Sequence, residues 1–82
     1  MNKKEKILIT GITGFVGSHM VDFLIENTNS KIYGLKRPNS QMKNIHHVAH
    51  DIELINGDLN DQTSLIRIIK KIKPDKIYHF GH

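Results

Sequence analysis

Three regularly spaced glycines between an apolar run and an amphipathic stretch constrain the fold of this chain more than any other feature. Residues 10–17 read Thr-Gly-Ile-Thr-Gly-Phe-Val-Gly, which gives the spacing Gly-x-x-Gly-x-x-Gly. Residues 7–10 have the pattern of a buried strand, and residues 15–26 have helical spacing. A glycine-rich turn between a strand and a helix is typical of sites where backbone N–H groups bind a pyrophosphate. The motif therefore predicts the start of a Rossmann-like α/β domain.

The rest of the chain continues the alternation of strands and helices. Further strands are expected at residues 32–35, 52–55 and 76–80, and a second helix at 61–73. Residues 41–50 are either a short helix or an irregular connection. Strands that alternate with helices pair in parallel through right-handed crossovers. We therefore expect a partial, doubly wound parallel sheet of about four strands in the order 3-2-1-4, with the two helices on opposite faces.

Apolar spacing predicts which face each helix turns toward the sheet. Residues recurring at three- and four-residue intervals share one side of a helix. Asp61 is the expected N-cap of the second helix, and Pro74 follows its last turn. The positions expected to face the sheet are Val16, Met20, Phe23 and Leu24 in the first helix, and Leu65, Ile66, Ile69 and Ile72 in the second.

Each glycine of the motif has a separate physical reason in this interpretation. Gly11 permits the tight turn out of the strand, and Gly14 lets the backbone approach the phosphates without a Cβ atom. Gly17 lets the helix pack closely on the sheet. The residues expected to bind the cofactor are Gly11, Thr13, Gly14, Phe15, Val16, Gly17, Arg37, Asp58 and Leu59.

The end of the second strand predicts which nicotinamide nucleotide is bound. In NAD-binding domains an acidic residue about 20 residues beyond the glycines binds the ribose 2′-hydroxyl. Lys36 and Arg37 stand there instead, and Arg37 is 20 residues after Gly17. A guanidinium can form forked hydrogen bonds to a 2′-phosphate and stack on adenine, so NADP is expected rather than NAD. A solvated Lys-Arg pair is the alternative. Asp58 could accept a hydrogen bond from the adenine amino group or cap the local turn.

Composition and charge argue against several other classes of protein. The 82 residues amount to 9.4 kDa, which is one small domain or part of a larger one. The chain has no cysteine, which excludes disulfides and thiolate metal sites. A net charge of +4 with few aromatic residues does not favour nucleic-acid binding. No apolar run is long enough for a membrane span or a signal peptide, so a cytoplasmic protein is expected. His46, His47 and His50 could suggest a metal site, since His46 and His50 would share one face of a helix, but no third ligand of evident spacing follows and no metal site is expected.

Several motifs together resemble the extended short-chain dehydrogenase/reductase family that acts on nucleotide sugars. They are the glycine motif at 10–17, Asn-Gly-Asp-Leu-Asn-Asp at 56–61 and Lys-Pro-Asp-Lys-Ile-Tyr-His at 73–79. Within that family, the 56–61 segment and Tyr-Gly-Leu-Lys-Arg at 33–37 most resemble the GDP-mannose 4,6-dehydratases. Related reductases and epimerases share most of these motifs. The family commonly has Leu-Ala-Ala or Leu-Gly-Ala after the fourth strand, whereas residues 80–82 here are Phe-Gly-His.

The resemblance implies that residues 1–82 are the amino-terminal part of a dinucleotide-binding Rossmann domain, without the substrate domain. Family members carry a catalytic Tyr-x-x-x-Lys motif. Tyr33 and Tyr78 are each followed four residues later by another residue type, so no catalytic residue is expected in this chain. The expected function is therefore that of the NADP-binding part of a nucleotide-sugar 4,6-dehydratase, a lyase, inactive by itself.

Partners and alternatives follow from the same resemblance. It implies a nucleotide-sugar substrate and a homo-oligomer for the full-length family. The alternatives are another epimerase or reductase of the family, or a stand-alone nucleotide-binding module without turnover.

The fourth strand is expected at an edge of the sheet, where unpaired backbone favours association. We therefore expect these 82 residues alone to be weakly stable or to self-associate.

Overall fold

An inner strand of the sheet is β1 (Lys6–Thr10), whose apolar residues Ile7, Leu8 and Ile9 are fully buried. A computed structural model describes residues 4–37, 41–57 and 60–80 of the chain. On one side β1 pairs in parallel with β2 (Lys31–Lys36), which pairs in turn with β3 (Glu53–Asn56). On the other side β1 pairs in parallel with β4 (Lys76–His79). The order β3-β2-β1-β4 confirms the expected topology.

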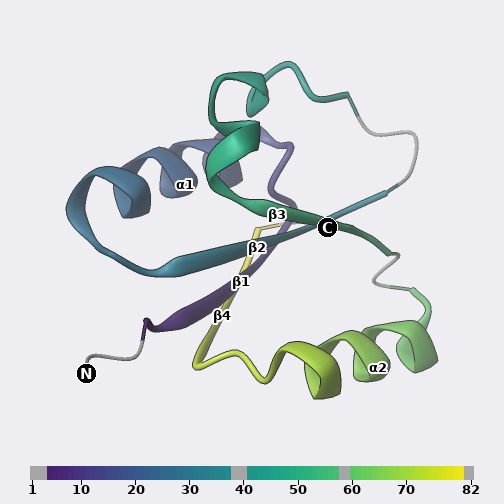
Figure 1. Ribbon diagram of the computed structural model, residues 1–82. Coiled ribbons are helices and arrows are strands. Elements are labelled where there is room, and N and C mark those ends of the chain that lie inside the picture. Colours follow the sequence, from purple (N-terminus) through teal and green to yellow (C-terminus); the bar gives the residue numbers. More distant parts are fainter. Residues whose placement is uncertain (1–3, 38–40, 58–59, 81–82) are drawn as a thin grey trace.

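Two helices cover opposite faces of this sheet, as the right-handed crossover rule predicts. α1 (Phe15–Asn27) lies on one side of the strands and α2 (Gln62–Ile72) on the other (Figure 1). Alternate residues of β1 serve the two faces: Ile7 and Ile9 belong to the hydrophobic cluster that contains α1 side chains. Leu8 belongs to the second cluster, with Ile72 of α2. Each helix therefore completes its own half of the core.

The expected apolar face of α1 is partly wrong. Val16 and Phe23 are 59% and 58% exposed, whereas Gly17 and Ser18 are buried with Val21 and Leu24. The reason is that the helix begins in close contact with the glycine turn, and only small residues fit between the two. Hydrophobic spacing alone gives too little weight to such small residues. The first turn of α1 therefore turns Val16 outward, and the helix packs through its later apolar residues.

The expected face of α2 needs one correction. Leu65, Ile69 and Ile72 pack into the second cluster as expected, together with Ile68. Ile66 is 53% exposed and lies outside it. The helix continues from Gln62 to Ile72, and Lys73 ends it in the left-handed conformation with φ 53°. Within the described residues, no helix is long and apolar enough to cross a membrane.

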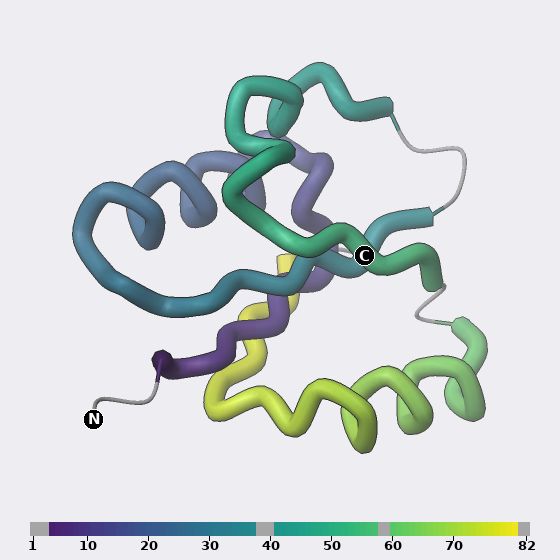
Figure 2. The backbone as a smooth tube through the Cα atoms, in the orientation of Figure 1, coloured from purple at the N-terminus to yellow at the C-terminus, as the bar shows by residue number. Residues whose placement is uncertain are grey.

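The ambiguous region between β2 and β3 forms a 3₁₀ helix, η1 (His46–Asp51). This segment lies on the α1 side of the sheet (Figure 2). Ile45 and Val48 are buried in the cluster that contains α1 side chains, so the connection is part of the core. Its packing brings the segment that precedes η1 close to the glycine turn.

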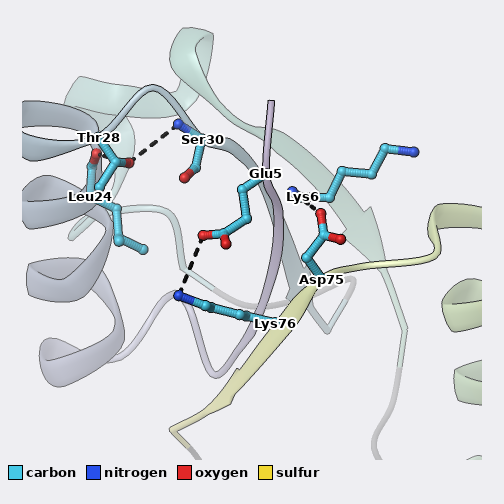
Figure 3. A network of polar contacts seen from close by, with 7 residues as sticks. All are labelled: Glu5, Lys6, Leu24, Thr28, Ser30, Asp75 and Lys76. Carbon is cyan, nitrogen blue, oxygen red and sulfur yellow. Dashed lines mark hydrogen bonds and ion pairs between the residues drawn. The ribbon is translucent and has the colours of Figure 1, made fainter. Parts of the chain in front are cut away.

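Polar contacts connect the amino ends of β1 and β4 (Figure 3). The backbone N–H of Lys6 donates to Asp75 Oδ2 at 2.8 Å, and the N–H of Asp75 donates to the carbonyl of Lys6 at 2.8 Å. Lys76 Nζ lies 3.6 Å from Glu5 Oε1. These contacts hold the turn between α2 and β4 against the start of β1.

Candidate functional site

The glycine turn leads directly from β1 into α1. Gly11 has φ 70°, a left-handed conformation that favours glycine. The N–H of Gly14 donates to the carbonyl of Gly11 at 3.1 Å and closes the turn. The chain thereby reverses within four residues, so that α1 starts at the carboxyl end of the central strand.

Gly17 and Gly14 meet different surroundings. A Cβ atom at Gly17 would lie 3.0 Å from the carbonyl carbon of Gly11 and 3.1 Å from Ile12 Cα, with the Gly11 carbonyl oxygen closer still. Those atoms are backbone and have little room to shift. A Cβ atom at Gly14 would meet only the Gly11 carbonyl oxygen, at 3.4 Å. Gly17 is therefore a packing position, whereas Gly14 is exposed and has room for a Cβ atom.

The amino terminus of α1 has backbone donors without intrahelical acceptors. The first bond into the helix runs from the Ser18 N–H to the carbonyl of Gly14 at 3.0 Å. The N–H groups of Phe15, Val16 and Gly17 precede that bond, as the first amides of any helix do. Gly14 is the N-cap and offers no side-chain acceptor, and the first turn contains no acidic residue. This helix end, where the dipole is positive, suits an anion.

α2 shows the opposite arrangement at its own amino terminus. The Asp61 carboxylate accepts a hydrogen bond from the Ser64 N–H at 3.1 Å, which confirms Asp61 as the N-cap. The carboxylate of Asp61 therefore already occupies the positive end of the α2 dipole. Among the described residues, the amino terminus of α1 has no side-chain cap, whereas that of α2 has one.

Arg37 lies at the same edge of the sheet as the glycine turn. Because all the strands are parallel, their carboxyl ends meet at one edge, where α/β folds bind their ligands. Leu35 is the register partner of Thr10, and Arg37 follows two residues later with its side chain exposed. The N–H of Gly57 donates to the carbonyl of Lys36 at 2.8 Å, which brings the end of β3 beside it. Asp58 and Leu59 lie outside the described residues.

Two contacts of the glycine turn were not anticipated from the sequence. The side chain of Ile12 is fully buried and lies over Gly34 of β2, where a Cβ atom would be 3.1 Å from Ile12 Cγ2. Asn44 Nδ2 donates to the carbonyl of Thr13 at 3.0 Å. In the sequence, only the lack of a side chain at Gly34 hints at a close contact there. Nothing in the sequence indicates the contact of Asn44. Both contacts depend on tertiary packing between segments far apart in the chain.

Two histidines contact side chains from other elements. His47 Nε2 lies 2.8 Å from Asp22 Oδ1, which links η1 to α1 at the surface. His79 Nδ1 lies 2.6 Å from Thr10 Oγ1, which links the carboxyl ends of β4 and β1. Across residues 4–37, 41–57 and 60–80, His, Cys, Asp and Glu form no group of three that could hold a metal ion.

The sheet order, the two crossover helices and the glycine turn define a Rossmann-type α/β fold. A family model described as GDP-mannose 4,6 dehydratase matches residues 8–82. The chain therefore belongs to the GDP-mannose 4,6-dehydratase family.

Individual relatives agree with this family. A GDP-mannose 4,6-dehydratase of Yersinia enterocolitica is 41% identical over 86 residues, which cover 94% of this chain and 23% of the relative. Among solved structures, a UDP-N-acetylglucosamine 4-epimerase of Methanobrevibacter ruminantium, in complex with UDP-N-acetylmuramic acid, is 30% identical. Its TM-score is 0.74, with 98% of this chain and 25% of that one covered. A dTDP-glucose 4,6-dehydratase of Bacillus anthracis, in complex with NAD, has a TM-score of 0.83 at 22% identity, covering 94% and 26%. The chain thus spans about a quarter of the length of these proteins.

Proposed function

We propose that this chain is the NADP-binding amino-terminal part of a nucleotide-sugar 4,6-dehydratase that acts on GDP-mannose. The observation that carries the proposal is the amino terminus of α1: among the described residues no side chain caps its first amides, and a Cβ atom at Gly14 would meet one carbonyl oxygen, at 3.4 Å. A pyrophosphate would accept hydrogen bonds from these amides and would be stabilised by the helix dipole. The residues proposed to hold the cofactor are Gly11, Thr13, Gly14, Phe15, Val16, Gly17, Arg37, Asp58 and Leu59.

Arg37 supports NADP over NAD in this proposal. Its exposed guanidinium follows β2 at the carboxyl edge, where NAD-binding domains carry an acidic residue for the ribose. A guanidinium would form charge-assisted hydrogen bonds to a 2′-phosphate, whereas NAD offers it only hydroxyl groups. Bound NADP would supply the hydride acceptor and donor for the sugar chemistry. The residues of this chain would bind and orient it, and the catalytic residues would lie outside this chain.

The cofactor proposal is tested by titrating the protein with NADPH and NADH. Arg37→Ala should weaken NADPH binding by on the order of 1–3 kcal/mol, because a charged hydrogen bond is lost, and should change NADH binding much less. Arg67→Ala is the matched control, since Arg67 is an exposed arginine of α2. Equal losses for the two nucleotides would contradict the role of Arg37 at the 2′-phosphate. Wild-type protein that binds neither nucleotide would contradict the site itself.

The dehydratase proposal concerns the whole protein and needs a separate experiment. The intact mass of the native product in its source cell should be several-fold above 9.4 kDa, and that protein should dehydrate GDP-mannose when NADP is supplied. Product formation is followed by mass spectrometry of the nucleotide sugar, with UDP-glucose and dTDP-glucose as comparison substrates. A native mass of 9.4 kDa without turnover would instead favour a nucleotide-binding module.

A further inference from the structure

The side-chain amide of Asn44, from the segment between β2 and η1, contacts the glycine turn. Asn44 Nδ2 donates to the carbonyl oxygen of Thr13 at 3.0 Å, and the two residues are 31 positions apart in the sequence. Asn44 does not belong to the motif, and it is an exposed residue. The contact therefore joins two segments that the sequence alone does not connect.

The backbone that carries Asn44 is fixed by its neighbours. Ile45 is fully buried in the same hydrophobic cluster as Ile12 of the turn. The N–H of Ile45 donates to the carbonyl of Met42 at 3.1 Å, and the N–H of Val48 donates to the carbonyl of Ile45 at 3.0 Å. Two consecutive tight turns and a buried side chain thus hold Asn44 in place.

The bond acts on a peptide unit whose other polar atom is also occupied. The carbonyl of Thr13 and the N–H of Gly14 belong to one planar peptide group. The N–H donates to the carbonyl of Gly11 at 3.1 Å, and the carbonyl accepts from Asn44 at 3.0 Å. Rotation of this peptide would break both bonds. The pair of bonds therefore fixes the orientation of the peptide that leads into α1.

We propose that Asn44 is a positioning residue for the phosphate-binding turn, an inference that rests on the proposed cofactor site. The amides of Phe15, Val16 and Gly17 follow the Thr13–Gly14 peptide directly, so its orientation sets where they point. A carbonyl oxygen carries partial negative charge, and a freely rotating Thr13 carbonyl would bring that charge to a site meant for an anion. By holding the carbonyl, Asn44 keeps the turn in its anion-binding form before the ligand arrives.

The first test measures the turn without any ligand. Amide hydrogen exchange of the full protein, followed by mass spectrometry of the peptide spanning residues 11–17, reports how often the Gly14 N–H opens. Asn44→Ala should speed exchange there by about 3- to 10-fold, the loss expected for one hydrogen bond. Asn44→Gln keeps an amide donor and should restore part of the protection.

Asn27→Ala is the matched control for this test. Asn27 Nδ2 donates to the carbonyl of Phe23 at 2.9 Å, the same kind of bond at the other end of α1. Its loss should leave exchange over residues 11–17 at the wild-type rate. Unchanged exchange in Asn44→Ala, or an equal increase in Asn27→Ala, would overturn the role of Asn44.

The second test measures binding. Asn44→Ala should raise the Kd for NADPH and for NADH by similar factors, about 3- to 10-fold, because the two nucleotides share the pyrophosphate. This pattern differs from that of Arg37→Ala, which should discriminate between them. Faster exchange with unchanged affinity for both nucleotides would overturn the positioning role. Wild-type protein that binds neither nucleotide would overturn the proposed function, while the exchange result would still decide whether Asn44 holds the turn.

Discussion

Gly14 and Gly17 are three residues apart in one turn, yet the structure gives them separable tasks. At Gly17 an added Cβ atom would press on backbone atoms of Gly11 and Ile12. At Gly14 it would meet one carbonyl oxygen at 3.4 Å, and φ −77° suits any L-residue. One glycine is therefore required by packing, and the other stands free on the exposed side of the turn.

Alanine at each position should separate stability from binding. Gly17→Ala should lower the free energy of unfolding by about 1–3 kcal/mol, because overpacking forces the helix away from the turn. Gly14→Ala should stay within about 0.5 kcal/mol of the wild type and should weaken NADPH binding, since its Cβ would occupy the open side of the turn. Urea unfolding and nucleotide titration of both variants check this. Similar unfolding free energies for the two variants would contradict the distinction.

How far single residues could be predicted depends on whether their role is local. The conformation of Gly11 and the close packing of Gly17 follow from a strand, a turn and a helix in succession, and the structure has both. Arg37 is at the edge where the count of residues put it, although its ligand stays a prediction. Asn44 could not be found, because an asparagine in a segment without hydrophobic periodicity carries no signal of a contact 31 residues away.

At the scale of the elements, the two described α-helices differ in how their amino termini are capped. The Asp61 carboxylate binds the Ser64 N–H in α2, whereas α1 has a glycine at the equivalent position. The sequence predicted the Asp61 cap, because capping is a local property of a few residues, but it gave no cap for the first helix. The sequence pattern was a poorer guide to which side of each helix faces the sheet. Val16 and Phe23 look like core positions by spacing, but α1 approaches the turn through Gly17 and Ser18.

Removing the Asp61 cap of α2 should destabilise the protein more than replacing Asp61 by asparagine does. Asp61→Ala should reduce the free energy of unfolding by about 1 kcal/mol, because the Ser64 N–H loses its acceptor. Asp61→Asn retains an acceptor oxygen and should lose only a fraction of that. The two variants are compared by urea unfolding monitored by circular dichroism. An alanine variant as stable as the wild type would show that the cap contributes nothing measurable.

At the scale of the whole molecule, the strand order could be predicted because one feature of the sequence and one general rule narrow the possible topologies. Strands alternate with helices, and right-handed crossovers then leave few arrangements. The segment between β2 and β3 could not be predicted in the same way. Its single-turn spacing of Ile45 and Val48 is too short to indicate a helix, and its place in the core depends on cluster contacts with α1 and β1. Yet this segment supplies the contact that holds the glycine turn.

The two edges of the sheet differ in how well they resist association. β3 has Glu53 exposed at one end of a short strand, and charge at an edge discourages pairing with another chain. At the opposite edge β4 pairs with β1 among the described strands, and its Ile77 is 50% exposed. Apolar surface beside unpaired backbone groups is the usual basis of strand-to-strand association. Self-association of the 82-residue polypeptide should therefore proceed through β4.

A pair of isoleucine variants distinguishes association through the β4 edge from association driven by any exposed apolar surface. Ile77→Lys should shift the polypeptide toward monomer in sedimentation velocity, because it places a charge on the edge and removes apolar surface. Ile66→Lys is the control: Ile66 is 53% exposed, but it lies on α2, where the backbone is already paired within the helix. It should associate like the wild type. If both variants dissociate equally, exposed apolar area drives association rather than the strand edge, and a wild-type monomer at high micromolar concentration would show that β4 needs no partner at all.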